Sequence, residues 1–362
     1  MKVLIILPSL KDPGGVASYY NSVLPHLNEH EDLQITSFEI GSSVTNNRLF
    51  HPILDQLRFI RQLNSKRFDL VHVNPSLNLK SFIRDGLFTF RAKRKKLPVI
   101  VFFHGWDESF YKKLSGGLKL FFNLTYGRSD GFIVLAADFK QKLIAKGIRR
   151  PIHIMSTAVD ESLVKNFSIE TKIDHLKQAN PLKILFLSRI EKEKGVFETI
   201  DACNLLIGKE YDIILSIAGD GGAKQEVVSY IQTKGLQNRV FTLGYITGEQ
   251  KKYAFEEHDI YCLPSYSEGM PSSVLEAMAF GMPVVTRPVG GLKDFFINGN
   301  MGYMAATTNP EEIAACLEKL ISDKSHMCNA SRYNYEYAKK HFMASKAAQA
   351  LREINELTLA SK

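Results

Sequence analysis

The 362-residue sequence predicts an α/β protein built from two tandem domains, each a doubly wound parallel sheet covered by helices. Apolar runs of about four to six residues alternate with amphipathic segments along the whole chain, which is typical of such sheets. The chain is too long for one ordinary core, and two domains of roughly 170 residues each are expected. A content of 45% hydrophobic and 23% charged residues is that of a globular protein.

Two series of apolar runs predict the strands. The first series is 3–7, 34–38, 70–73, 99–103, 131–135 and 152–155, and the second is 183–187, 213–218, 240–243, 260–263 and 284–286. A polar stretch at about 161–181 lacks strong periodicity and is expected to be a linker. The segment from about 344 to 359 has a helical pattern.

The charges are unevenly distributed. Residues 1–165 hold 24 Lys and Arg against 14 Asp and Glu, whereas the remainder holds 22 against 24. A basic N-terminal half predicts an anionic partner for the first domain. Because the chain has no apolar run of eighteen residues and no signal peptide, we expect a cytoplasmic protein. Its four cysteines form no C-x-x-C pair, so we expect buried free thiols.

The segment 263–285 carries the strongest functional signal. A buried strand leads into a loop with Glu268, and a helix is expected to begin near 271–273 and to end at Gly281. The start of a helix attracts phosphate, because the dipole places about half a positive charge there. Glu268 and Glu276 would repel phosphate, so we expect them to bind neutral hydroxyl groups beside it. The stretch predicts a nucleotide-sugar site with further contacts from Gly269, Met270, Ser272 and Ser273.

An alternative explains part of this pattern. Ser273 and Glu276 have the spacing of a capping box, in which Glu276 would bond back to the helix start.

These residues resemble the signature of the retaining glycosyltransferases of family 4 (group 1). The matching stretches are Glu268-Gly269-Met270-Pro271, Glu276-Ala277-Met278-Ala279 and Gly281-Met282-Pro283-Val284-Val285. The resemblance implies the GT-B fold, two tandem Rossmann-like doubly wound domains with the active site in the cleft between them. It also implies that Glu268 contacts the donor sugar and Glu276 the ribose.

The resemblance also suggests how the chain is divided. We expect an N-terminal acceptor domain over residues 1–165 and a C-terminal nucleotide-sugar donor domain over 166–343. The final helix, about 344–362, is expected to pack back onto the N-terminal domain.

Two cations follow the first strand of the second series. Arg189 and Lys194 lie five residues apart on a strand-to-helix loop, and together they suit a diphosphate. The resemblance assigns them that role. A solvated charge cluster is the alternative, and it explains Lys192 well.

The N-terminal half supplies weaker candidates. Gly14 and Gly15 form a loop that the resemblance places against the donor, although an ordinary tight turn would have the same residues. His104 ends a strand, where a histidine is often structural, but the resemblance places it on the donor sugar. Candidate acceptor contacts are Asn74, Asp107 and Glu108.

Basic residues also gather at 91–96 and, among aromatic residues, at 110–122. This mixture suits an anionic membrane surface, and a solvated face is the alternative. No nucleic-acid motif accompanies the charge, so nucleic acid is not an expected partner.

Together these features predict a retaining hexosyltransferase that uses a UDP- or GDP-sugar and needs neither a metal ion nor another cofactor. We expect a glycan or lipid-linked acceptor, in bacterial surface polysaccharide or glycolipid synthesis, with a peripheral position on the inner face of the cell membrane. The alternatives are a non-catalytic nucleotide-sugar-binding subunit and a GT-B-type epimerase or phosphorylase. The last would need its own acid/base pair, and none is evident.

Overall fold

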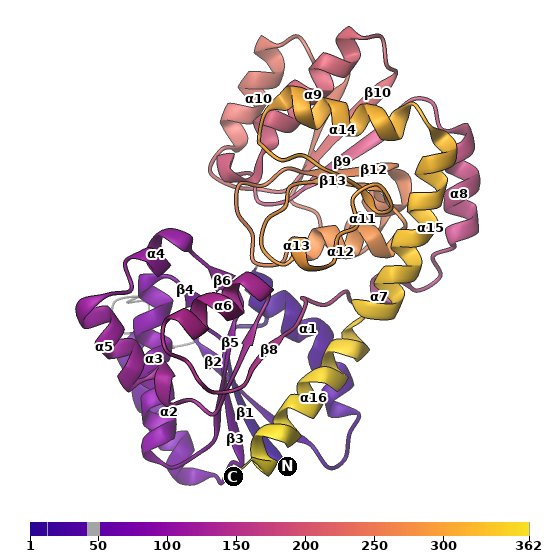
Figure 1. Ribbon diagram of the computed structural model, residues 1–362. Helices are drawn as coiled ribbons and strands as arrows, with labels where there is room; N and C mark the ends of the chain where they lie inside the picture. Colours follow the sequence, from indigo (N-terminus) through magenta and orange to yellow (C-terminus); the bar gives the residue numbers. More distant parts are fainter. Residues whose placement is uncertain (13, 42–50, 362) are drawn as a thin grey trace. The chain divides into compact units, whose positions relative to one another are not determined.

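A computed structural model describes residues 1–12, 14–41 and 51–361 (Figure 1). The chain forms two compact units. The N-terminal unit comprises Met1–Ala158 together with Ala344–Lys362, and the C-terminal unit comprises Val159–Met343. Each unit is a parallel sheet with helices packed on its faces, so the predicted fold class is confirmed. None of the helices in the described residues is long and apolar enough to cross a membrane.

The sheet of the N-terminal unit has the strand order β2-β1-β3-β5-β7-β8, and all neighbouring strands are parallel. The order reverses at β1 and β3, and such a point is where open α/β sheets bind ligands. The strands are β1 (Lys2–Pro8), β2 (Gln34–Ile40), β3 (Leu70–Val73), β5 (Val99–Phe103), β7 (Gly131–Val134) and β8 (Ile152–Ile154). The short strands β4 (Ser76–Leu77) and β6 (Gly105–Trp106) pair beyond the carboxyl edge.

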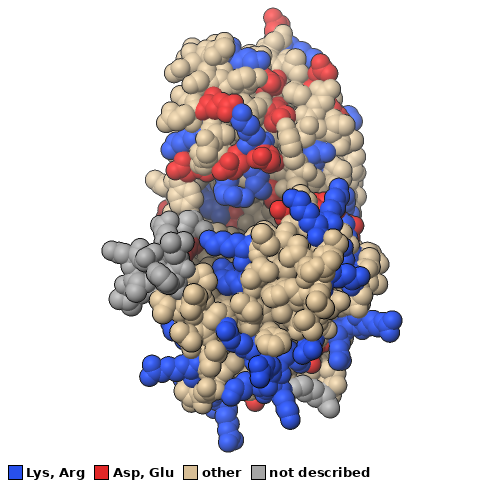
Figure 2. All heavy atoms as spheres, turned by 90° about the vertical axis from the view of Figure 1, so that its left-hand side faces the viewer, with Lys and Arg blue, Asp and Glu red and all other residues tan. Residues whose placement is uncertain are grey.

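Helices cover both faces of this sheet. They are α1 (Gly15–Asn28), α2 (His51–Ser65), α3 (Leu79–Arg94), α4 (Glu108–Lys112), α5 (Gly116–Leu124), α6 (Ala137–Ala145) and α16 (Ala344–Ala360), with a 3-10 turn at Tyr126–Arg128. Helices α2, α3 and α5 lie on one side of the unit, and Figure 2 shows that side, where Lys and Arg side chains are numerous.

The C-terminal segment is part of the N-terminal unit. Helix α16 packs against α1, and Asn355 Oδ1 lies 2.5 Å from His72 Nε2 at the buried strand β3. Arg352 adds an ion pair with Asp32 at 3.0 Å. The helix therefore joins this unit through a buried polar contact as well as through apolar packing.

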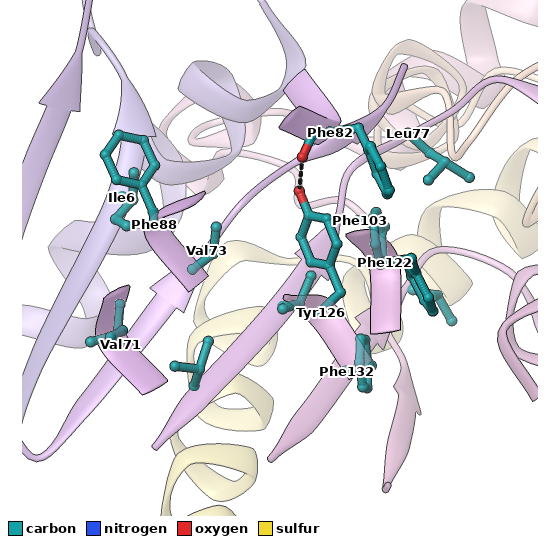
Figure 3. Close-up of a cluster of buried hydrophobic side chains, with 14 of the residues drawn as sticks. Ile6, Val71, Val73, Leu77, Phe82, Phe88, Phe103, Phe122, Tyr126 and Phe132 are labelled. Carbon is teal, nitrogen blue, oxygen red and sulfur yellow. Dashed lines mark hydrogen bonds between the residues drawn. The ribbon is translucent and has the colours of Figure 1, made fainter. Parts of the chain in front are cut away.

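The core of the N-terminal unit is rich in aromatic side chains (Figure 3). Phe82 of α3 packs on Tyr126 and Phe122, and the Tyr126 hydroxyl donates to the carbonyl of Phe82 at 2.8 Å. Burial raises the pKa of Tyr126 far above its usual value. The ring contact with Phe122 joins α3 to α5, and the hydrogen bond from Tyr126 joins α3 to the 3-10 turn that follows α5.

The sheet of the C-terminal unit has the order β11-β10-β9-β12-β13-β14, again all parallel. The order reverses between β9 and β12. The strands are β9 (Leu182–Leu187), β10 (Ile213–Ala218), β11 (Val240–Gly244), β12 (Ile260–Leu263), β13 (Val284–Thr286) and β14 (Gly302–Met304), the last of which the sequence pattern did not predict.

The helices of this unit include two in the stretch predicted to be a linker. They are α7 (Glu161–Val164), α8 (Ile169–Gln178), α9 (Val196–Gly208), α10 (Lys224–Thr233), α11 (Gly248–Glu257), α12 (Ser272–Ala279), α13 (Leu292–Phe295), α14 (Pro310–Ile321) and α15 (Lys324–His341), with a 3-10 turn at Lys192–Lys194. The linker prediction is wrong because α8 buries Ile173 and Leu176 and packs on α15.

Candidate functional site

In the C-terminal unit, the loops that follow β9 and β12 lie side by side where the strand order reverses. Gly195 has a φ of +78°, and a Cβ there would lie 2.6 Å from the carbonyl oxygen of Pro264. The backbone N–H of Tyr266 donates to the carbonyl of Glu193 at 2.8 Å. Glycine therefore permits the close approach of two loops at the position where doubly wound sheets bind ligands.

Glu268 is held between these loops by two partners. Lys194 Nζ lies 2.7 Å from Glu268 Oε1, and the Ser265 hydroxyl donates to the same oxygen at 2.7 Å. The side chains of Lys194 and Glu268 are 14% and 11% exposed, so both remain within reach of a ligand. The structure thus joins the residue predicted to bind the diphosphate to the residue predicted to bind the sugar.

Glu276 is the more deeply buried carboxylate. Its side chain is 5% exposed, and Lys251 of α11 donates to its Oε1 at 2.6 Å. The other oxygen, Oε2, has no hydrogen-bond partner among the residues that the structure describes. A buried polar atom without a hydrogen-bond partner carries a free-energy cost. A hydrogen bond from a ligand hydroxyl group to this oxygen would remove that cost.

The capping-box alternative for Glu276 is wrong. Helix α12 begins at Ser272 with Pro271 as its N-cap and without a side-chain capping bond. Ser273 lies inside the first turn, 2.7 Å from the Tyr261 hydroxyl, and Glu276 bonds to Lys251 instead of to the helix start. The uncapped first turn leaves backbone N–H groups available for an anion.

Gly290 fixes the position of the loop that carries Glu268 and Gly269. It has a φ of +52°, and a Cβ there would lie 2.2 Å from the carbonyl oxygen of Gly269. The N–H of Gly291 donates to that same carbonyl at 2.8 Å. Met270, the next predicted donor contact, is buried. The paired glycines were visible in the sequence, but their contact with this loop was not.

Arg189 differs from the other candidate cation. It is exposed and forms no ion pair with any residue in the described ranges, whereas Lys192 pairs with Glu226 at 2.7 Å. A Cβ at Gly219 would lie 1.8 Å from the carbonyl oxygen of Ser188, so only glycine allows the loop after β10 to approach the backbone beside Arg189 this closely. The solvated-charge alternative is thus confirmed for Lys192, and Arg189 is left available for an anion.

In the N-terminal unit, a hydrogen-bonded cluster lies at the carboxyl ends of β3 and β5. Tyr20 donates its hydroxyl to Asn74 Oδ1 at 2.8 Å, and His104 Nε2 lies 3.1 Å from the same oxygen. Asn74 is buried, and its Nδ2 donates to the carbonyl of Ile6 at 2.8 Å. Because this amide is already engaged on both sides, its predicted contact with an acceptor stays a prediction.

The His104 ring is half-buried against Phe102, with ring centroids 3.8 Å apart. Removal from water, with a smaller effect of nearby His72, lowers the pKa of His104 to about 3. The imidazole is therefore neutral near pH 7. Since Asn74 Oδ1 accepts a hydrogen bond, Nε2 carries the proton and Nδ1 has the lone pair. Contact with a donor sugar stays a prediction for this residue.

Gly14 and Gly15 lie at the start of α1, and the adjoining Pro13 lies outside the described residues. Gly14 is exposed with a φ of +157°, and a Cβ at either glycine would meet no atom within 4 Å. The first turn of α1 has neither a side-chain cap nor an acidic residue. This uncapped helix start could receive an anion, and the tight-turn alternative stays open.

Asp107 and Glu108 have partners of their own. Asp107 is the N-cap of α4 and accepts from the N–H groups of Ser109 and Phe110, and its bonds with Ser109 lower its pKa. Glu108 pairs with Lys142 at 2.6 Å. Their predicted acceptor contacts stay predictions. The described part of the chain contains no group of three or more His, Cys, Asp or Glu that could hold a metal ion.

Comparison with known proteins gives two family matches. Residues 168–341 match the family model described as Glycosyl transferases group 1, and residues 20–163 match the model described as Glycosyltransferase Family 4. Together the two matches cover most of both units.

Individual relatives agree with these matches. The chain is 27% identical over 228 residues to the amylovoran biosynthesis glycosyltransferase AmsK of Erwinia amylovora, covering 61% of this chain and about half (54%) of that relative. It is 24% identical to the uncharacterized glycosyltransferase MJ1178 of Methanocaldococcus jannaschii, covering 98% of each chain.

A solved structure supports the fold over the full length. The crystal structure of Anabaena HepE in complex with UDP-glucose is 19% identical, covers 100% of both chains and superposes with a TM-score of 0.76. Two tandem Rossmann-like units are the fold of the GT-B glycosyltransferases.

Proposed function

Because the chain belongs to the glycosyl transferases of group 1 and has the GT-B fold, we propose that it transfers a hexose from a UDP- or GDP-sugar to a hydroxyl group of a glycan or lipid-linked acceptor, with retention of anomeric configuration. The alternative of a subunit that binds the donor without reacting it is kept as an outcome of the test below.

One observation carries the proposal. At the strand-order reversal of the C-terminal unit, Glu268 and Glu276 lie before and within the uncapped helix α12, and Lys194, from the loop after β9, contacts Glu268 at 2.7 Å. Glu276 Oε2 has a free acceptor position among the described residues, suited to a ribose hydroxyl, and Glu268 is suited to a sugar hydroxyl. Arg189 and Lys194 supply the positive charge that a diphosphate needs.

The proposed reaction breaks the bond between the anomeric carbon and the β-phosphate oxygen and forms a bond to the acceptor oxygen on the same face. The acceptor proton passes to a phosphate oxygen of the departing nucleoside diphosphate. Arg189, Lys194 and the N–H groups of α12 stabilise the charge that grows on this leaving group. Preorganised electrostatic contacts of this kind often contribute the largest part of catalysis.

The comparisons support the choice of substrate class. HepE is described in complexes with UDP and with UDP-glucose, and relatives include glycosyltransferases of amylovoran and teichuronic acid biosynthesis. On these grounds we propose a UDP- or GDP-sugar donor and an acceptor in the synthesis of a surface polysaccharide or glycolipid.

Calorimetric titration of the full chain with UDP- and GDP-sugars tests donor binding, and donor hydrolysis or transfer tests the reaction. We expect one donor to bind and to be consumed, and Glu276→Gln to weaken its binding by about 10- to 100-fold through loss of a charge-assisted hydrogen bond. NMR of the product is expected to give the same anomeric configuration as the donor. Binding without turnover of any donor would favour the non-catalytic subunit.

A further inference from the structure

An apolar face of the N-terminal unit is exposed across three neighbouring helices. Helices α2 and α3 contact each other, as do α3 and α5. On α3 the exposed apolar side chains are spaced four residues apart, which places them on one side of the helix. The exposed apolar residues are Ile53, Leu57, Leu79, Ile83, Leu87, Leu120 and Leu124.

Two of the helices that carry this face, α3 and α5, are packed closely together. A Cβ at Gly86 would lie 2.6 Å from the ring of Phe121, so glycine lets α3 and α5 approach each other. Leu120 and Leu124, which are 60% and 42% exposed, are neighbours of that contact on α5. Exposed apolar residues gathered in this way mark an interaction surface, whereas single ones are common on any protein.

The same helices expose positive charge without exposing negative charge. Their carboxylates in the described structure are Asp55 and Asp85; both are buried and pair with Arg58 and Arg84. Exposed cations on these helices and directly after them are Arg58, Arg61, Lys66, Arg67, Lys80, Arg94, Lys95, Lys96 and Lys119. Figure 2 shows this side of the unit, where Lys and Arg side chains border areas without charge.

The structure changes which residues make this surface. The sequence suggested aromatic residues at 110–122, but Phe110 and Phe122 are buried in the core. The exposed apolar groups are the leucine and isoleucine side chains of α2, α3 and α5. Of the exposed lysines on this face, Lys95, Lys96 and Lys119 belong to the basic segments noted in the sequence.

We propose that the face formed by α2, α3 and α5 docks on an anionic lipid surface. Apolar side chains bordered by lysine and arginine are the composition of helices that lie in a membrane interface. A second copy of the chain fits less well, because a symmetric pairing would bring two positively charged borders together. This inference rests on the proposed function, which includes a lipid-linked acceptor. It deepens that function by naming the surface that would bring the chain to such an acceptor.

Sedimentation with lipid vesicles tests the proposal. The full chain is mixed with vesicles of phosphatidylcholine and with vesicles that also contain phosphatidylglycerol. We expect binding to the anionic vesicles that weakens as salt rises, since exposed charges are screened beyond about 8–10 Å. We expect Leu120→Ser to lower the partition constant about fivefold or more, and Lys119→Glu about tenfold or more.

Two exposed residues of α16 in the same unit provide matched controls. Leu357 is 61% exposed, nearly the same as Leu120, and Lys346 is also exposed. Leu357→Ser and Lys346→Glu should each change the partition constant less than twofold, and circular dichroism checks that every variant is folded.

Three results would overturn the proposal. The first is that the chain binds neither kind of vesicle. The second is that the variants and their controls lose vesicle binding equally. The third is that sedimentation velocity shows a dimer that Leu120→Ser dissociates. Donor turnover is measured on the same preparations without lipid. Vesicle binding without turnover would refute the proposed function while supporting this surface, and turnover without vesicle binding would do the reverse.

Discussion

Replacing Lys251 with methionine is expected to destabilise the C-terminal unit, because it leaves the buried Glu276 carboxylate without its ion-pair partner. The two side chains are 19% and 5% exposed and are joined at 2.6 Å. Removing one partner of a buried pair costs about 3–5 kcal/mol, and we lower this to about 2–3 kcal/mol because Lys251 is partly solvated. Lys252→Met is the matched control, since its pairing with Glu256 at 4.0 Å is a weak contact between adjacent turns of a helix.

Urea unfolding separates this effect from damage elsewhere. The single tryptophan, Trp106, lies in the N-terminal unit, so its fluorescence reports that unit while circular dichroism reports both. We expect Lys251→Met to shift only the transition that the fluorescence does not follow, and the double variant Lys251→Met/Glu276→Gln to recover at least about 1 kcal/mol. A Lys251→Met variant as stable as Lys252→Met, or a double variant no better than the single one, would refute this account.

Three further outcomes are expected. Because cations supply the countercharge, turnover should survive EDTA, and activity lost on chelation and restored by Mg²⁺ would contradict this. Burial lowers the pKa of His72 to about 4, so the unfolded chain binds more protons below about pH 6.5. His72 should therefore contribute a fall of up to about 3 kcal/mol in the free energy of unfolding from pH 6.5 to 4, in addition to the fall from His104, whose pKa is also lowered. A His72→Gln variant with the same slope as the wild type would count against the assignment. Gly290→Ala should cost at least about 2 kcal/mol through its clash with Gly269, measured against Gly235→Ala, whose Cβ would meet no atom within 4 Å.

The sequence predicted the sheets well because buried parallel strands are short apolar runs with clear ends. The predicted strands 70–73, 99–103, 213–218, 260–263 and 284–286 agree with the structure residue for residue. Strand β14 was missed because its sequence, Gly-Tyr-Met, begins with glycine and has no β-branched residue, whereas the equally short β13 reads Val-Val-Thr.

The linker prediction was wrong because the inner face of α8 contains a charged residue. Lys172 is 3% exposed and donates hydrogen bonds to carbonyls at the end of α11, including that of Glu256 at 2.7 Å. A lysine on the buried side breaks the apolar periodicity that identifies a helix. The hydrogen bonds that Lys172 donates to these carbonyls offset the free-energy cost of burying its charge.

The candidate site was predicted as separate residues, and its pairings were not. Glu268 and Glu276 were recognisable from spacing, but Lys251 lies 25 residues before Glu276 on another helix, and no local pattern links them. The pairing of Lys194 with Glu268 joins residues 74 positions apart. The second pairing depends on the strand order that brings β9 beside β12, which the sequence pattern alone does not give.

The most direct test of the central claim compares two cations on one loop. At saturating donor, Arg189→Ala should lower kcat by about 10²–10³ if Arg189 stabilises charge on the leaving diphosphate, with donor affinity falling less. Lys192→Ala, which removes a solvated charge three residues away, should leave kcat within about twofold of the wild type. An Arg189→Ala enzyme with the same kcat as Lys192→Ala would contradict the claim.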